Sequence, residues 1–216
     1  VPYTCFQTLL YDAQHSHNII LELENIYLLS IFDLILFLQI VDMYILSLDH
    51  LINGVDDFVN SMKSAECFAE KESTLVTIGV EPNFPSTGYG YIQFGKKSIL
   101  DKNIDIYRVK TFAEKPHREV AEKFFHSKEF LWNSGIFVWK AKKILQEMKI
   151  YMCELHQSLE NIYDNLNSET YESTLIKEWQ IIESESIDYG ILEKSKDVFV
   201  VKGKFGWSDL GTWDSL

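Results

Sequence analysis

The sequence predicts an α/β fold on the basis of three successive patterns. A short apolar run, Tyr44 to Leu48, is typical of a strand. Apolar residues then recur at helical spacing between Val55 and Phe68, and residues 75–80 (LVTIGV) form a β-branched run after that helix. The order strand, helix, strand is typical of a βαβ unit, in which the two strands are parallel and the crossover is right-handed.

The rest of the chain predicts further strands and helices around one shaped loop. Two prolines and two glycines in residues 81–92 (EPNFPSTGYGYI) argue against a helix and indicate a loop that leads into a strand. Ser186 or Asp188 is placed to cap a late helix, and the polar residues 165–184 predict no element. Further strands are expected at residues 107–112, 135–139 and 198–201, and further helices at residues 117–127, 142–165 and 189–194.

The composition excludes several classes of function. With 216 residues, 46% of them hydrophobic, the chain can bury one sizeable core. A net charge of -12 leaves no basic face for a phosphate backbone, so we expect no nucleic-acid partner. The three cysteines, Cys5, Cys67 and Cys153, are far apart and form no CxxC spacing, which argues against a disulfide framework and a zinc site. We therefore expect a cytoplasmic protein.

One segment raises the question of a membrane. Residues 26–41 (IYLLSIFDLILFLQIV) are strongly apolar, but they fall short of the roughly 20 residues that a span needs and they include Asp33. No secretory signal is visible at the start of the chain. We therefore favour a buried helix, or a segment that has drifted from its original sequence, over a membrane span.

Polar or glycine residues lie near the ends of the predicted strands in four separated stretches. In open α/β sheets, ligands bind beyond the carboxyl ends of the strands. We therefore expect these stretches to converge on one site. They are LDHLI (48–52), TGYGYI (87–92), TFAEKP (111–116) with WNSGIF (132–137), and WSDLGTW (207–213).

Asp49 and Asp209 each follow an apolar strand. Two carboxylates at adjacent strand ends can hold Mg²⁺, which keeps several waters and bridges substrate phosphates. This pair therefore predicts a phosphoryl-transfer centre. The alternative is structural: Asp49 would cap the following turn, and Asp209 would cap a helix that starts at Leu210.

Glu114 and Lys115 follow a strand and precede Pro116, whose ring stiffens the chain. Because adjacent strand residues point to opposite faces, only a bend lets both side chains meet one ligand. Lys115 would then supply a positive charge for a phosphate, and Glu114 would accept hydrogen bonds from sugar hydroxyls. A solvent-exposed ion pair is the alternative.

Two further stretches carry weaker signals of a ligand site. Gly88 and Gly90 would let the backbone pass close to a sugar, although a turn with positive φ followed by a hairpin is the alternative. Asn133 can both donate and accept hydrogen bonds, as sugar hydroxyls require, but Asn before Ser-Gly is also common in turns. The tryptophans at positions 132, 139, 207 and 213 are expected to pack in the core or at its rim.

Six strings in order resemble the bacterial mannose-1-phosphate guanylyltransferases, also called GDP-mannose pyrophosphorylases. They are LDHLI, TLVTIGVEPNFPSTGYGYI, VKTFAEKP, LWNSGIFVW, SIDYGILEKS and FGWSDLGTWDSL. The resemblance spans Asp42 to Leu216. It implies a Rossmann-like nucleotidyltransferase fold, with a mixed sheet flanked by helices. It also implies the reaction of mannose 1-phosphate with GTP to give GDP-mannose and pyrophosphate, and it is compatible with a homodimer.

The resemblance assigns roles to the candidate residues. Asp49 and Asp209 would hold Mg²⁺, and Lys115 would neutralise the sugar phosphate. Together these three would form the catalytic set. The remaining candidates would bind the mannose: Glu114, Asn133 and the loop of Gly88, Tyr89 and Gly90.

The chain departs from the family in its N-terminal part. Residues 18–22 (NIILE) match the family, but nothing from Val1 to Gln14 resembles its glycine-rich Gly-Thr-Arg-Leu-Trp-Pro-like string, which holds the nucleotide phosphates. We therefore interpret residues 1–41 as a diverged remnant and residues 42–216 as the nucleotidyltransferase domain. Weak or absent GTP turnover is expected. The alternatives are a non-catalytic, sugar-phosphate-binding subunit and a transferase for another nucleotide or hexose phosphate.

Overall fold

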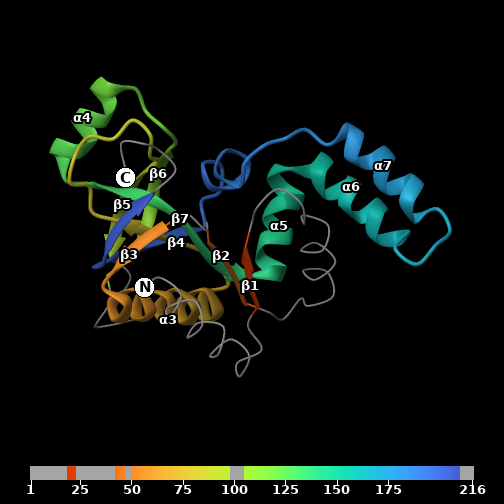
Figure 1. Ribbon diagram of the computed structural model, residues 1–216, viewed down its shortest axis with the longest axis horizontal. Coiled ribbons are helices and arrows are strands. Elements are labelled where there is room, and N and C mark those ends of the chain that lie inside the picture. The colour runs from red at the N-terminus through yellow and green to blue at the C-terminus, as the bar shows by residue number, and fades with distance from the viewer. Residues whose placement is uncertain (1–18, 23–41, 47–49, 98–104, 210–216) are drawn as a thin grey trace.

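The computed structural model describes residues 19–22, 42–46, 50–97 and 105–209. Within these ranges the chain forms a seven-stranded mixed sheet and a two-stranded sheet, with helices on both faces (Figure 1). The predicted α/β fold class is thus confirmed. The strands are β1 (Ile19–Glu22), β2 (Asp42–Leu46), β3 (His50–Asn53), β4 (Leu75–Val80), β5 (Tyr91–Lys97), β6 (Ile106–Ala113), β7 (Phe130–Lys140), β8 (Val198–Gly203) and β9 (Gly206–Asp209).

The helices follow the predicted positions, with differences described below. They are α3 (Val55–Glu72), α4 (Arg118–Ser127), α5 (Ala141–Tyr151), α6 (Cys153–Asp164), α7 (Tyr171–Ile181) and the π-helix η1 (Asp188–Leu192). In the part of the chain with described coordinates, none of them is long and apolar enough to cross a membrane. Residues 26–41, the apolar segment of the sequence, lie outside the described residues.

Two apolar cores lie on opposite faces of the large sheet. The α3 side chains Phe58, Met62 and Phe68 pack on one face. On the other face, residues of α5, α6 and η1 form the second core. β4 alternates between the two cores: Leu75 joins the second, whereas Val76 and Ile78 join the first. Burial on both faces explains the nearly continuous apolar sequence of this strand.

The two strands of the predicted βαβ unit, β2 and β4, run parallel as expected, but they are not neighbours in the sheet. β7 lies between β2 and β4 and is antiparallel to both, and the parallel partner of β4 is β8. The reason is that β7 comes from much later in the chain, with eleven residues that are mostly buried. Local periodicity predicts that a strand exists, but it does not show which later strand is inserted beside it.

The long helix predicted at residues 142–165 is interrupted at Met152, which has φ -132° and ψ 53°. Its apolar stripe continues across the break because Met148, Met152 and Leu155 all contact the same core. Periodicity alone therefore misses the break.

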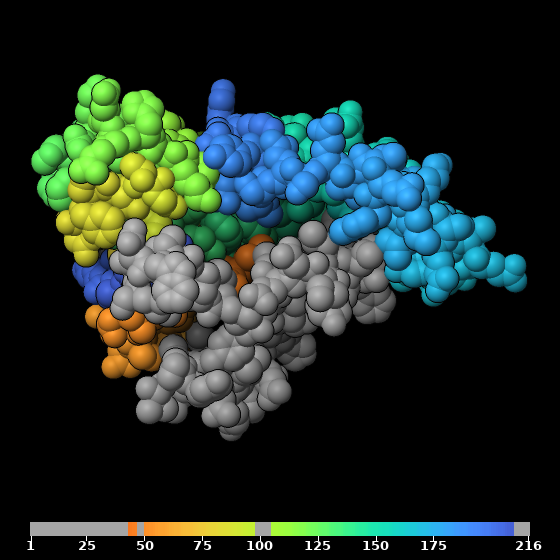
Figure 2. Space-filling model, turned by 45° about the horizontal axis from the view of Figure 1, so that its top comes forward, coloured from red at the N-terminus to blue at the C-terminus, as the bar shows by residue number. Residues whose placement is uncertain are grey.

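Helix α7 is not predicted by the sequence, because its pattern is reversed relative to an ordinary amphipathic helix. Glu178 is buried, whereas Ile176 and Trp179 are exposed. An inward-facing apolar stripe, the signal by which helices are found in sequence, is therefore missing. Together, α6 and α7 extend away from the sheet (Figures 1 and 2).

Strand β7 changes its neighbour halfway along its length. Its first part pairs with β5, as in the register of Trp132 with Tyr91. Its last part pairs with β2, beginning at Phe137 opposite Ile45. Between these two parts the ladder with β4 shifts register and Gly135 adopts a φ of +69°, so the strand bulges. This change of partner opens a place in the sheet where side chains from other elements can enter.

A partly buried ion-pair network joins α5 to the start of β8. Lys143 Nζ lies 2.7 Å from Glu147 Oε1 and 2.7 Å from Asp197 Oδ2. The side chains of Lys143 and Glu147 are only 11% and 7% exposed. The carbonyl of Asp197 also accepts hydrogen bonds from the Thr74 hydroxyl and the Leu75 N–H at the start of β4.

We predict that Lys143→Met lowers the free energy of unfolding by about 3 kcal/mol, because it leaves the Glu147 carboxylate buried without its cation. Urea denaturation measures the change. As a control, Arg118→Ala removes a pair with Glu122 in which the arginine is 81% exposed, and it should cost less than about 1 kcal/mol. Equal losses in the two variants would contradict the account.

Candidate functional site

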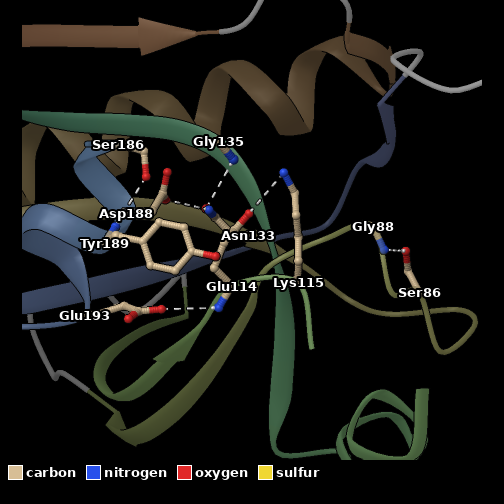
Figure 3. Close-up of polar contacts among 10 residues, drawn as sticks. All are labelled: Ser86, Gly88, Glu114, Lys115, Asn133, Gly135, Ser186, Asp188, Tyr189 and Glu193. Atoms are coloured by element: carbon tan, nitrogen blue, oxygen red, sulfur yellow. Dashed lines mark hydrogen bonds and ion pairs between the residues drawn. The ribbon is translucent and has the colours of Figure 1, made fainter. Parts of the chain in front are cut away.

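The change of partner along β7 brings together residues from three separate parts of the chain. Asn133 and Gly135 lie on β7, Glu114 and Lys115 follow β6, and Asp188 begins η1 (Figure 3). Ligand sites in open α/β sheets lie where strand connections diverge. The sequence-predicted convergence of TFAEKP with WNSGIF is therefore confirmed.

The left-handed backbone conformation of Lys115 brings the side chains of Glu114 and Lys115 to the same side of the chain. β6 ends at Ala113, and Lys115 adopts a φ of 42° before Pro116. This conformation is uncommon for a residue with a side chain and is typically retained at functional sites. The bend brings Lys115 Nζ to 3.7 Å from Glu114 Oε1. The lysine side chain is 63% exposed and the glutamate 13%, so the cation remains open to solvent.

The loop before β5 supplies a close backbone approach at Gly90. A Cβ at this position would lie 2.3 Å from Glu114 Oε2 and 3.2 Å from the Asn133 Cβ. The Gly90 carbonyl also accepts a 2.8 Å hydrogen bond from the Asn133 N–H. Neither Gly88 nor Gly90 has a positive φ, so the alternative of a positive-φ turn is wrong. The space beside Glu114 is what requires glycine at position 90.

Gly88 and Tyr89 lie in the same loop but have different surroundings. The Gly88 N–H donates to the Ser86 hydroxyl at 3.1 Å, and the space around Gly88 is otherwise open. The Tyr89 ring makes edge contacts with Trp132 at 5.0 Å and with Trp207 at 5.1 Å between ring centroids. Burial raises the pKa of the Tyr89 hydroxyl, and the charge of Asp209 raises it further. Tyr89 thus connects this loop to the strand that ends at Asp209.

Asp188 is a site residue that the sequence analysis does not assign. Its Oδ1 accepts a 3.0 Å hydrogen bond from Asn133 Nδ2. The Asn133 Oδ1 in turn accepts from the Gly135 N–H at 3.1 Å. The position of Asp188 in the SIDYGILEKS string is the available signal, but local sequence suggests only a helix cap there. The capping contact comes from Ser186 instead, because its hydroxyl accepts a 3.4 Å hydrogen bond from the Tyr189 N–H.

Three carboxylates, those of Glu114, Asp188 and Glu193, lie close to one another in the described part of this cluster, and Lys115 attracts the first two. The Glu193 carboxylate accepts a 3.3 Å hydrogen bond from the Glu114 N–H. Burial raises the pKa of Glu114, and the charge of Asp188 raises it further, while Lys115 opposes the shift. Burial likewise raises the pKa of Asp188, against the hydrogen bond from Asn133. The cluster therefore offers several acceptors to hydroxyl groups and a cation to a phosphate.

The predicted metal ligands are only partly described. Asp209 is the last residue of β9 and lies opposite His50 of β3, whereas Asp49 lies outside the described residues. Among the residues with described coordinates, no group of three His, Cys, Asp or Glu side chains could hold a metal ion. His50 Cε1 lies 4.0 Å from the place of a Cβ on Gly135. The β3–β9 pair thus borders the β7 cluster.

The aromatic residues confirm the packing role expected of them wherever they are described. Trp132 and Trp139 are 2% and 0% exposed. Trp207 makes edge contacts with the rings of Tyr89 and His50. Trp213 lies outside the described residues.

Comparison with known proteins assigns the family. A family model described as nucleotidyl transferase matches residues 30–216. The chain therefore belongs to the nucleotidyltransferase family.

Two named relatives of the chain have a more specific name than the family model. The chain is 37% identical over 179 residues to a mannose-1-phosphate guanylyltransferase of Escherichia coli, across 81% of this chain and 38% of that protein. It is 40% identical over 177 residues to the protein of the same name from Klebsiella pneumoniae, across 81% and 37%. The family resemblance predicted from the sequence is thus confirmed. The chain spans less than two fifths of the length of these relatives.

Solved structures give the same fold. A structure titled mannose-1-phosphate geranyltransferase, from Thermus thermophilus, matches with a TM-score of 0.68 and 27% identity, over 81% of this chain and 48% of that one. A structure titled mannose-6-phosphate isomerase, from Helicobacter pylori, matches with a TM-score of 0.69 and 26% identity, over 94% and 80%. The predicted nucleotidyltransferase fold is therefore confirmed.

We predict that Gly90→Ala destabilises the protein by about 1 kcal/mol, because the added methyl group displaces the Glu114 carboxylate and presses on the Asn133 Cβ. Gly88→Ala is the matched control in the same loop, where the nearest atom is the Ser86 Oγ at 3.8 Å, and it should change stability by less than about 0.5 kcal/mol. Urea denaturation of both variants measures the difference. Equal stability of the two variants would show that the space beside Glu114 is not restricted.

The raised pKa of Glu114 predicts a specific pH dependence. The folded state binds this proton more tightly than the unfolded chain, so the free energy of unfolding falls as pH rises through the interval between the two pKa values. Glu114→Gln removes this loss. We expect its melting temperature at pH 7 to exceed that of the wild type by about 2–4 °C, with the difference disappearing in acid.

Thermal unfolding between pH 4 and pH 8 tests this expectation. Glu169→Gln, in the exposed turn between α6 and α7, is the control and should follow the wild type throughout. A Glu114→Gln protein that is no more stable than the wild type at pH 7 would show that burial of this carboxylate carries no cost.

Proposed function

We propose that this domain catalyses, in the cytosol, the transfer of GMP from GTP to mannose 1-phosphate, giving GDP-mannose and pyrophosphate. The observation that carries the proposal is the cluster at the β7 change of partner. It combines an exposed cation, Lys115, with the partly buried acceptors Glu114 and Asp188 and the amide of Asn133. A phosphorylated sugar presents the matching groups, a phosphate and several hydroxyls.

The polar residues divide between the two parts of the sugar phosphate. Glu114 and Asp188 would accept hydrogen bonds from hydroxyl groups, with Gly90 providing the space beside them. Lys115 would move from its 3.7 Å contact with Glu114 to the phosphate, which its exposed ammonium group can reach. The sugar is thereby held while its phosphate remains free to react.

Mg²⁺ is the cofactor that we propose. This ion is commonly held by one or two carboxylates together with substrate phosphates, so Asp209 suits it as one ligand without a dedicated protein cage. Asp49, which lies one residue before the strand partner of Asp209, would be the second. When bound, Mg²⁺ neutralises charge on the nucleotide phosphates.

The reaction itself would be an in-line attack by a phosphate oxygen of the sugar on the α-phosphorus of GTP. Phosphoryl-type transfers depend mainly on positioning and neutralisation of charge. Lys115 would contribute both, because it neutralises the attacking phosphate and orients it. Glu114, Asn133 and Asp188 would restrict the rotation of the sugar.

We predict that Lys115→Met lowers kcat/KM for GDP-mannose formation at least about 100-fold, because a positioned charge at the reacting phosphate is lost. Pyrophosphate release with GTP, mannose 1-phosphate and Mg²⁺ measures the rate. Lys123→Met, a lysine on α4, is the matched control and should retain wild-type activity. Comparable activity in the two variants would remove Lys115 from the mechanism.

A second candidate function is binding of the sugar phosphate without turnover. The observation that favours it is that Lys115, Glu114 and Asn133 suit a sugar phosphate whether or not a nucleotide binds beside it. Calorimetric titration with mannose 1-phosphate, together with the turnover assay, separates the two functions. Binding accompanied by robust GDP-mannose formation rules out the non-catalytic function, and binding without turnover rules out the catalytic one. Parallel assays with other nucleoside triphosphates and hexose phosphates test specificity.

A further inference from the structure

The hydrogen bonds around Asn133 determine which way its side-chain amide faces. An amide can be turned by 180° with little change in shape, so its neighbours must decide where the oxygen lies. The Gly135 N–H is a donor and needs an acceptor, which fixes the oxygen on its side at 3.1 Å. The Thr77 hydroxyl lies 3.4 Å from the same oxygen. The Asp188 carboxylate lies 3.0 Å from the nitrogen.

This arrangement leaves a donor rather than an acceptor for a ligand. The oxygen of the Asn133 amide is directed toward β7 and β4, where its contacts are. The nitrogen has two hydrogens, and the described residues supply one acceptor, Asp188. Asn133 lies between Asp188 and Gly135 and near Glu114 and Lys115 (Figure 3). Its second N–H is therefore available to an oxygen atom of a bound molecule.

We propose that Asp188 is a positioning residue, which holds the Asn133 amide so that it presents an N–H to an oxygen of the sugar phosphate. The proposal rests on the proposed function and makes it more specific. Glu114 accepts from the sugar, whereas Asn133 donates to it. Without Asp188, the amide nitrogen loses its fixed partner and the side chain can rotate away.

The surroundings of Asp188 keep its carboxylate in place. It begins a π-helix, a form that occurs frequently at functional sites. Gly190, two residues on, fits against Met152 so closely that a Cβ would lie 2.5 Å from the Met152 sulfur. Charged groups act on Asp188 from two sides: Lys115 attracts its carboxylate and Glu193 repels it. Its position is thus set by packing, and its charge is partly balanced.

The first test compares two substitutions of Asp188. Asp188→Ala removes the acceptor, and we expect it to weaken binding of mannose 1-phosphate at least about tenfold in calorimetric titration. Asp188→Asn retains an oxygen that accepts from Asn133, so it should remain within about threefold of the wild type. Equal losses in both variants would show that the charge of Asp188, not its hydrogen bond to Asn133, matters for binding.

A matched control comes from a similar pair far from the site. The Asn161 Nδ2 lies 3.4 Å from the Glu178 Oε1, where α6 meets α7, and Glu178 is buried. Glu178→Ala should lower the melting temperature without changing the affinity for mannose 1-phosphate. A loss of affinity in this control would mean that general destabilisation explains the Asp188→Ala result.

The second test exchanges the two side chains. Asn133→Asp sets two carboxylates against each other and should lower the melting temperature by several degrees, roughly 4 °C or more. Adding Asp188→Asn restores a donor opposite an acceptor, so the double variant should recover most of the loss. Its affinity should stay at least about tenfold below the wild type, because position 133 no longer has an N–H in its side chain.

These readouts separate the inference from the function on which it rests. If the wild type binds no mannose 1-phosphate, the proposed function fails, and with it the donor role of Asn133. The melting temperatures still report the bond between Asn133 and Asp188 in that case. If the exchanged variant binds as tightly as the wild type, the function stands and the donor role of Asn133 is overturned.

Discussion

The change of neighbour along β7 is the constraint on which the rest of the site depends. β7 pairs with β5 up to Trp132 and with β2 from Phe137, and Asn133, which contacts Asp188, lies between these two ladders. The bulge at Gly135 ends one ladder before the next begins. The side chain of Asn133 then takes the place of a strand partner by accepting the Gly135 N–H. One interruption in the sheet therefore creates both the space and the polar groups of the site.

The residues of the site also lower the stability of the fold. Glu114 and Asp188 are carboxylates in a poorly hydrated place, and burial raises the pKa of each. Lys115 adopts a left-handed conformation beside them. Natural proteins retain such features mainly where function requires them. The apolar cores on both faces of the sheet supply the stability that offsets them.

Much of this architecture could be predicted from the sequence, for identifiable reasons. β4 follows from its continuous β-branched run, all six residues of which are buried, and α3 follows from apolar residues at helical spacing. The pairing of β7 could not be predicted, because sequence periodicity carries no information on which distant strand is a neighbour. α7 escapes prediction because it buries Glu178 and exposes Trp179. The first failure concerns contacts between distant parts of the chain, and the second concerns a burial pattern opposite to that of an ordinary amphipathic helix.

The same distinction applies to the candidate site. Glu114, Lys115 and Asn133 could be predicted because the resembling family contains the same strings at the same places. Asp188 could not be assigned from its own surroundings in sequence, since its role comes from a side chain 55 positions away. Asp49 and the metal that it would hold with Asp209 stay predictions.

The most direct test of the central claim is an NMR titration of the isotope-labelled protein with mannose 1-phosphate. The account predicts that amide shifts concentrate at Gly90, Lys115, Gly135 and Tyr189, around the interruption in β7. It also predicts that the side-chain NH₂ signals of Asn133 move with them. Shifts confined to the groove between α6 and α7, which Leu155 and Ile181 line, would contradict the account.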